Sequence, residues 1–76
     1  MARLPQVSGK RMVKVLQSFG WLVRHQKGSH VVMKHAAHPE VRIVVPCHGS
    51  KTLAKGTLGR IIKDAGLTGD QVRDLL

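Results

Sequence analysis

Three short strand-like segments, joined by connections of only a few residues, occupy the middle of this chain and restrict the folds open to it. The segments cover residues 21–26, 30–35 and 41–45, and residues 27–29 and 36–40 connect them. A parallel crossover needs a dozen or more residues, which is more than these connections provide. The sequence therefore predicts an antiparallel meander of three strands.

Amphipathic helical segments flank the strands on both sides. Ser8 is a suitable N-cap for the first helix, and Gly20 is placed to end it. The second helix is expected from about residue 56 to residue 65, before Gly66. The apolar residues that recur at helical spacing in the two segments are Met12, Val15, Leu16, Phe19, Leu58, Ile61, Ile62 and Ala65.

A last short helix completes the predicted fold. Thr68 and Gln71 have the spacing of a capping box, ahead of Val72, Leu75 and Leu76. The order α-β-β-β-α, followed by this terminal helix, predicts an α+β fold with helices on one face of a three-stranded antiparallel sheet. With 76 residues, the chain is expected to form one domain, residues 1–76, whose core is thin. The other face of the sheet is left for solvent or ligand.

Alternation along the strands predicts which side chains face the helices. The first strand is ambiguous, because Leu22 is apolar on the side opposite Val23. The side chains predicted to be buried are Trp21, Val23, Val31, Met33, Val41, Ile43 and Val45. The open face is predicted to carry Arg24, His30, Lys34 and Arg42, together with the apolar Val32 and Val44.

The charge of the chain is strongly positive and unevenly distributed. The sequence has 13 Lys or Arg against 4 Asp or Glu, a formal net charge of +9. Residues 1–39 hold seven of the basic residues and no acid, whereas all four acids lie in residues 40–76. Such a field attracts polyanions, of which nucleic acid is the commonest in the cytosol. The alternatives are a merely soluble surface or a protein partner with an acidic face.

Other features exclude several classes of function. Phe19 and Trp21 are the only aromatics, too few for a base-stacking platform. The single Cys47 rules out an internal disulfide framework, and the apolar runs are too short to span a bilayer, so a cytoplasmic protein without membrane contact is expected. Adjacent Cys47 and His48, even with His35 and His38, lack the spacing of a zinc site. We expect no metal or other cofactor.

His30 is the leading catalytic candidate. The acids are few and scattered, which argues against a nuclease built on carboxylate-bound Mg²⁺. RNA carries its own nucleophile, the 2′-hydroxyl, and histidine can remove that proton near neutral pH. His30 follows Gly28 and Ser29 in the first turn, beside Lys27. The alternative for His30 is an ordinary surface position, and Ser29 either assists His30 or simply forms the turn.

Two further positions have open interpretations. Lys51 and Lys55 precede Gly56 and Thr57, where free amides at a helix N-terminus could bind a phosphate. The alternative is that Gly56 or Thr57 only caps the helix. His48 either reaches the open face as a second proton-transfer group or stays solvated at the end of the hairpin.

Two longer strings resemble a known family. Residues 21–30 read W-L-V-R-H-Q-K-G-S-H, and residues 48–66 read H-G-S-K-T-L-A-K-G-T-L-G-R-I-I-K-D-A-G. With the opening Ser8-Gly9-Lys10, they resemble the HicA family, the mRNA-cleaving toxins of HicAB toxin–antitoxin pairs, over residues 8–76. The resemblance implies a fold like that of a double-stranded-RNA-binding domain. It also implies that the G-S-H histidine, here His30, is essential for cleavage, and that a HicB antitoxin covers the active face.

The sequence therefore predicts the toxin of a type II toxin–antitoxin pair. We expect a metal-independent endoribonuclease that cleaves mRNA with His30 as the proton-transfer group. The residues predicted to contact the RNA are Arg24, Lys27, Ser29, Lys34, Arg42, Lys51 and Lys55. The alternatives are a non-catalytic double-stranded-RNA-binding module and a protein whose basic face binds only an acidic partner.

Overall fold

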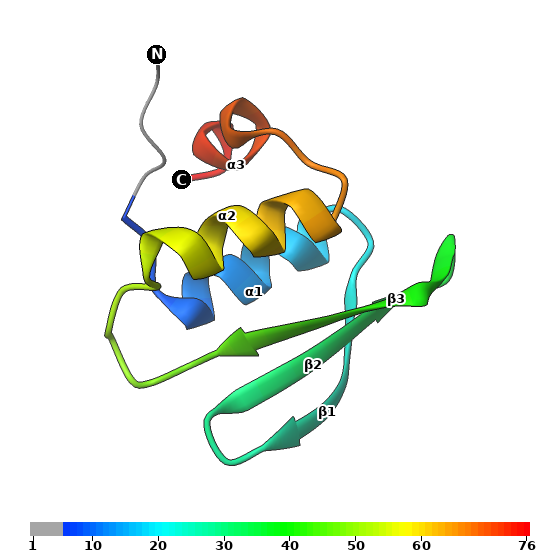
Figure 1. The fold of residues 1–76 in the computed structure, drawn as a ribbon, viewed down its shortest axis with the longest axis horizontal. Helices are drawn as coiled ribbons and strands as arrows, with labels where there is room; N and C mark the ends of the chain where they lie inside the picture. The colour runs from blue at the N-terminus through cyan, green and yellow to red at the C-terminus, as the bar shows by residue number, and fades with distance from the viewer. Residues whose placement is uncertain (1–5) are drawn as a thin grey trace.

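The computed structural model describes residues 6–76, so the first five residues of the predicted domain 1–76 lie outside the described residues. The three strands form one antiparallel sheet in the order β1-β2-β3 (Figure 1). This arrangement confirms the α+β prediction. The elements follow in the order α1 (Gly9–Ser18), β1 (Leu22–Lys27), β2 (His30–His35), β3 (His38–Pro46), α2 (Lys55–Asp64) and α3 (Gly69–Asp74).

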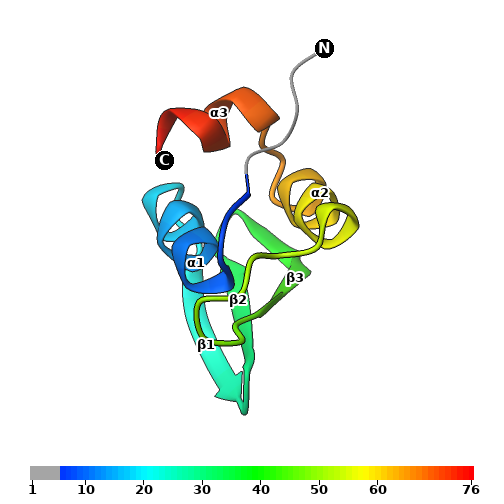
Figure 2. The same ribbon diagram turned by 90° about the vertical axis from the view of Figure 1, so that its left-hand side faces the viewer.

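Helices α1 and α2 lie side by side on one face of the sheet, and α3 lies beyond them on the side away from the sheet (Figures 1 and 2). The hydrophobic core fills the space between these layers. Val72 of α3 belongs to the same core. The largest fully buried side chains are Trp21, Met12, Leu16, Met33, Ile43, Leu58, Val45 and Val72.

The helix ends follow the predicted capping chemistry in two of three cases. The Ser8 side chain accepts a hydrogen bond from the Arg11 amide, and Thr68 and Gln71 form the reciprocal capping box. Helix α2 differs, because Ala54 is its N-cap and provides no side-chain hydrogen bond. The expectation that Gly56 or Thr57 caps this helix is therefore wrong.

Strand β1 departs from strict alternation. The register with β2 shifts between Val23 and His25, which indicates a bulge at this point. Beyond the bulge, His25 pairs with Val32 on the open face. Strict alternation from Val23 would place Gln26 on the open face, but it pairs with Val31 of the core face. A bulge has little sequence signature, so alternation alone misplaces the residues that follow it.

Two of the predicted core positions are less covered than expected. Val23 pairs with the buried Met33 but is 43% exposed, and Val41 is only half-buried. All of β1 is exposed, because it is an edge strand that the helices do not cover. The prediction that Val23 is buried is therefore wrong. Val32, expected on the open face, is only 8% exposed and lies outside the main core cluster.

The second hairpin is tighter than predicted. Only Ala36 and Ala37 form the turn, and β3 begins at His38 rather than at residue 41. The His35 ring stabilises this turn: its Nε2 lies 3.0 Å from the Phe19 carbonyl oxygen, and its Nδ1 accepts a hydrogen bond from the Ala37 amide. The rings of His35 and His38 also pack against the buried Trp21, so both histidines serve the structure.

Candidate functional site

His30 is the first residue of β2 and has an exposed side chain. It pairs with Lys27 of β1 on one side and with Pro46 of β3 on the other. Gly28, with φ of 58°, forms the turn that returns the chain to this position. His30 therefore lies where the last residues of β1 and β3 meet the first residue of β2.

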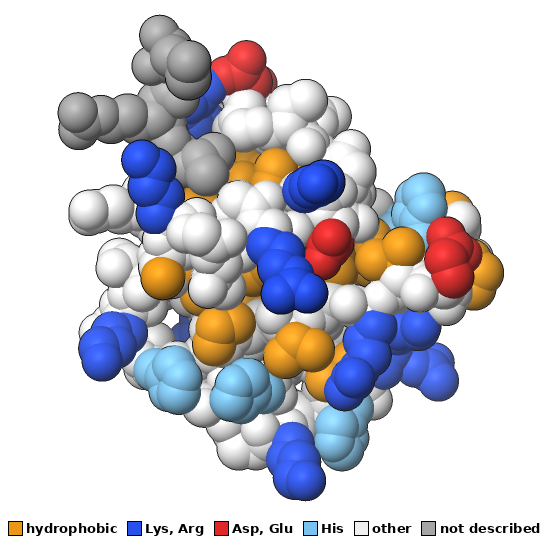
Figure 3. Space-filling model, viewed as in Figure 1, with side chains coloured by type: hydrophobic (Ala, Val, Ile, Leu, Met, Phe, Trp, Pro, Cys, Tyr) orange, Lys and Arg blue, Asp and Glu red, His pale blue; other side chains and the backbone are white. Residues whose placement is uncertain are grey.

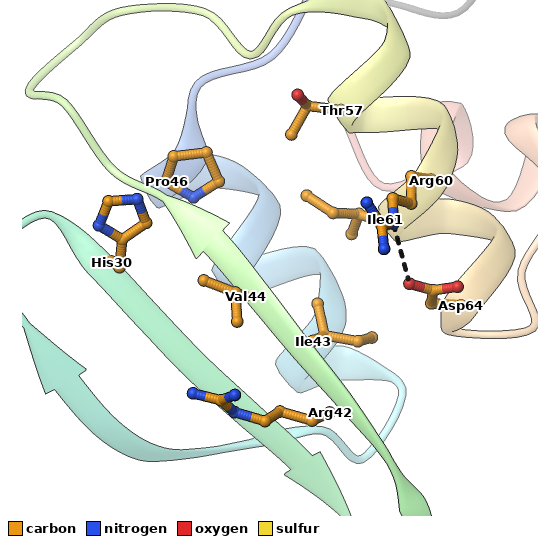
Figure 4. A pocket seen from close by; sticks show the side chains of 9 residues that line it. All are labelled: His30, Arg42, Ile43, Val44, Pro46, Thr57, Arg60, Ile61 and Asp64. Atoms are coloured by element: carbon orange, nitrogen blue, oxygen red, sulfur yellow. Dashed lines mark ion pairs between the residues drawn. The ribbon is translucent and has the colours of Figure 1, made fainter.

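A groove of about 400 Å³ lies between β3 and α2 beside His30 (Figure 4). Its floor includes the buried side chains of Ile43 and Ile61, and Arg60 and Asp64 form an ion pair of 4.0 Å at its rim. We refer to it as the β3–α2 groove. Its lining residues are His30, Arg42, Ile43, Val44, Pro46, Thr57, Arg60, Ile61 and Asp64.

A second hollow, of about 220 Å³, lies between the 47–54 loop and the start of α2. We refer to it as the loop hollow. Its lining residues are Pro46, His48, Lys51, Thr52, Leu53, Ala54 and Thr57. Because Pro46 and Thr57 line both spaces, the loop hollow continues the β3–α2 groove. In the view of Figure 3, Lys, Arg and His side chains surround exposed apolar patches.

His48 lies next to His30, and the two side chains line adjoining spaces, His30 the β3–α2 groove and His48 the loop hollow. The ring centroids are 6.1 Å apart and the ring planes are nearly perpendicular, at 84°. The Cys47 amide donates a hydrogen bond to the Ser29 carbonyl, which extends the β2–β3 pairing past Pro46. The Lys51 amide then bonds to the His48 carbonyl at 3.0 Å across a turn. The exposed ring of His48 therefore lies beside the leading catalytic candidate, whereas the sequence left open whether it reaches the open face or stays solvated at the end of the hairpin.

The segment before α1 holds the 47–54 loop in place. The Leu53 amide donates to the Val7 carbonyl at 2.8 Å, and Ser8 and Thr52 form an isolated antiparallel bridge. These bonds connect the loop to the start of α1. They fix the position at which α2 begins, and hence the position of Thr57 relative to the strands.

A family comparison shows to which family the chain belongs. The family model described as HicA toxin of bacterial toxin–antitoxin matches residues 9–67. The chain belongs to the HicA toxin family. The match contains every residue that lines the β3–α2 groove and the loop hollow. No individual curated protein matches the chain.

Membership of the HicA family makes the chain the toxin of a toxin–antitoxin system, which implies an antitoxin as its partner. This confirms the family that the sequence strings indicate. No described helix is long and apolar enough to cross a membrane.

The structure gathers some of the predicted RNA contacts of this HicA toxin around His30. Arg42 lines the β3–α2 groove, Lys51 lines the loop hollow, and Lys27 is the register partner of His30. Ser29 is half-buried, and its carbonyl holds the Cys47 amide.

Three other predicted contacts lie differently. The Lys34 Nζ donates a hydrogen bond to the Pro39 carbonyl at 2.8 Å, within the β2–β3 hairpin. Arg24 lies at the β1 bulge, and Lys55 is the first residue of α2. None of the three lines either hollow. Of the cations predicted on the open face, Arg42 is therefore the one that lines a hollow beside His30.

Arg60 is a residue of the candidate site of this HicA toxin that the sequence did not indicate, and Thr57 was expected only as part of the helix N-terminus. Both line the β3–α2 groove from α2 (Figure 4). Their spacing of three residues, beside the buried Ile61, places them on one side of the helix. The periodicity could have grouped them, but only packing shows that this side faces β3.

The ionisable groups restrict what the site of this HicA toxin can do. Within residues 6–76, no group of three or more His, Cys, Asp or Glu is placed to hold a metal ion. Asp64, the carboxylate of the groove, is paired with Arg60. Burial raises the pKa of the Cys47 thiol, although Lys10 acts in the opposite direction, so Cys47 is a poor nucleophile. The side chains that the two hollows offer to a ligand include the imidazoles of His30 and His48 and the cations of Arg42, Arg60 and Lys51.

Proposed function

We propose that this HicA family toxin is a metal-independent endoribonuclease that cleaves mRNA, with His30 as the proton-transfer group. The observation that carries the proposal is the place of His30. Its exposed ring lines the β3–α2 groove together with Arg42 and Arg60. The ring of His48, 6.1 Å away, lines the adjoining loop hollow together with Lys51. A proton acceptor between cations suits an RNA phosphodiester.

The reaction uses the substrate's own nucleophile. His30 takes the proton from a ribose 2′-hydroxyl, whose oxygen attacks the adjacent phosphorus. The bond to the 5′-oxygen breaks, and the departing oxygen takes up a proton, so that a 2′,3′-cyclic phosphate and a 5′-hydroxyl end are formed. Negative charge builds on the phosphoryl oxygens in the transition state, and Arg42 and Arg60 are placed to stabilise it.

The RNA strand is proposed to follow the two hollows. The β3–α2 groove offers Arg42 and Arg60, and the loop hollow offers Lys51 beside the start of α2. The Ala54 N-cap gives the first turn of α2 no side-chain hydrogen bond, so amides there are available to a phosphate. Lys27, opposite His30, adds charge from β1.

A HicB-type antitoxin is proposed to neutralise the toxin by covering His30. Its contact surface is expected to be acidic, because complementary charge speeds encounter and fixes the orientation of the two partners. Val44, which is 37% exposed and lines the β3–α2 groove, offers an apolar anchor. Val32, the other apolar residue predicted on the open face, is only 8% exposed and offers little surface.

The test compares two exposed histidines. His30→Ala is expected to abolish RNA cleavage and toxicity, with the melting temperature of the fold unchanged. His25→Ala, which removes an exposed imidazole from β1 that lines neither hollow, is the matched control and is expected to retain both. Wild-type cleavage is expected to persist in EDTA. Full cleavage by the folded His30→Ala variant would overturn the proposal.

A further inference from the structure

We propose that His48 is a second catalytic residue, which protonates the 5′-oxygen leaving group while His30 removes the 2′-hydroxyl proton. This inference rests on the ribonuclease function proposed above and deepens it. The geometry points to it because the two rings, 6.1 Å apart between centroids, line adjoining hollows, His30 the β3–α2 groove and His48 the loop hollow.

The chemistry of RNA cleavage requires two proton transfers on opposite sides of the phosphorus. The entering 2′-oxygen and the departing 5′-oxygen are roughly in line with the phosphorus atom. One imidazole cannot contact both oxygens at the same moment, so a base and an acid act best as separate groups. The separation of His30 and His48 lets one phosphodiester contact both rings, each within hydrogen-bond reach of a different oxygen.

The surroundings of His30 and His48 leave their ring nitrogens available. Among the described residues, no hydrogen bond or ion pair engages either ring, and both side chains are exposed. His35 shows the opposite arrangement, since both of its ring nitrogens contact backbone groups. His35 therefore has a structural role, whereas the ring nitrogens of His30 and His48 are available to exchange protons.

The backbone holds His48 at this distance. The Cys47 amide is bonded to the Ser29 carbonyl, one residue before His30, so the two histidines directly follow a bonded pair of residues. The turn after His48 needs a positive φ, which Gly49 supplies at 59°. A turn fixed in this way holds the backbone of His48 at a constant position relative to His30, as a reacting group requires.

The step balances without any co-reactant. The 2′-oxygen–phosphorus bond forms as the 2′-hydroxyl proton moves to neutral His30. The phosphorus–5′-oxygen bond breaks as protonated His48 gives its proton to the departing oxygen. The enzyme is left with His30 protonated and His48 neutral, and proton exchange with water restores both.

Two proton-transfer groups predict a bell-shaped dependence of kcat/KM on pH. The rate falls at low pH when the base is protonated and at high pH when the acid has lost its proton. Removal of His48 is therefore expected to remove the alkaline limb. The other ionisable groups around the pair are Lys27 from β1, Arg42 from β3, Lys51 from the loop, and Arg60 and Asp64 from α2.

The experiment uses a short RNA that the wild type cleaves at one mapped linkage. A second substrate carries sulfur in place of the bridging 5′-oxygen at that linkage, because a thiolate leaves without a proton. His48→Ala is expected to lower kcat on ordinary RNA by roughly 10²- to 10⁴-fold, with little change in KM, and to lose the alkaline limb. On the sulfur substrate its rate is expected to return to near that of the wild type.

The controls separate this inference from the proposed function. Ser50→Ala changes an exposed residue of the same turn that lines neither hollow, and it is expected to behave as the wild type. His30→Ala is expected to stay inactive on both substrates. If His48→Ala keeps the wild-type rate and pH profile while His30→Ala is inactive, the inference is wrong and the proposed function stands. If the sulfur substrate rescues His30→Ala instead, the assignment of acid and base is wrong. A wild type that cleaves neither RNA overturns the proposed function itself.

Discussion

Gly9, at the start of α1, lies against the carbonyl group of Pro46, at the end of β3. A Cβ atom on Gly9 would be 2.1 Å from the Pro46 carbonyl oxygen and 3.0 Å from the Cys47 Cα. These neighbours are backbone atoms, which cannot rotate away as a flexible side chain can. This contact holds the start of α1 against the end of β3, from which the chain continues to His48.

Gly9→Ala is therefore expected to destabilise the protein, although alanine is the better helix former. Overpacking against backbone costs about 1–3 kcal/mol in the free energy of unfolding. Gly56→Ala is the matched control, because Gly56 is also in a first helical turn and a Cβ there would meet nothing within 4 Å. It is expected to gain up to about 1 kcal/mol. Urea unfolding of both variants measures the difference, and a stable Gly9→Ala protein would contradict the contact.

Removal of a single charge at the groove is expected to weaken RNA binding and to reduce its salt dependence. Arg42→Gln and Arg60→Gln each remove one cation from the β3–α2 groove. The slope of log affinity against log salt is expected to become shallower by about 1 for each lost phosphate contact. Lys14→Gln, on α1 and outside both hollows, is the matched control and is expected to leave the slope near the wild-type value. Equal effects of all three changes would show that the groove is not the binding path.

The Cys47 thiol is expected to react slowly until the pH is well above neutral. Burial raises its pKa above the ordinary value for a cysteine thiol, and its Sγ lies 3.6 Å from the Val45 carbonyl oxygen. The folded protein therefore holds the thiol proton more tightly than the unfolded chain does. This contribution to stability is complete below the ordinary pKa of the thiol and is lost as the pH rises through the folded pKa.

Alkylation by iodoacetamide at a series of pH values tests this expectation. The midpoint of the rate against pH is expected to lie higher for the folded protein than for the same protein in urea. Restricted access to the thiol slows the reaction at every pH but does not move the midpoint. A higher midpoint therefore reports a raised pKa and not shielding of the thiol. Coincident midpoints would rule out the raised pKa.

Val44→Asp is expected to weaken binding of the antitoxin by at least about tenfold, or about 1.4 kcal/mol. Val44 is an exposed apolar residue of the β3–α2 groove, and a carboxylate there would also meet an acidic partner. Leu22→Asp is the matched control, because Leu22 is 61% exposed but lines neither hollow. Calorimetric titration with the HicB-type antitoxin measures both. A larger loss for Leu22→Asp would place the interface at the far end of the sheet.

The order of the elements, the helix caps at Ser8 and Thr68, and most of the core were predictable from the sequence. Each depends on local chemistry, because a cap acts within one turn and an apolar period is set by the element itself. The positive charge of residues 1–39 and the candidate His30 could also be identified from the sequence, because both are local features of it. Local patterns were also enough to indicate the HicA family.

Other features depend on contacts between distant parts of the chain, and only the tertiary structure decided them. The bulge near His25 changes which side chains in the rest of β1 lie on each face of the sheet, and no local sequence pattern predicts it. The partnership of His48 with His30 depends on the extension of the β2–β3 pairing to Cys47. Arg60 joins the site because α2 packs along β3. Strand register and helix placement are set by how the whole core packs, which no short stretch of sequence specifies.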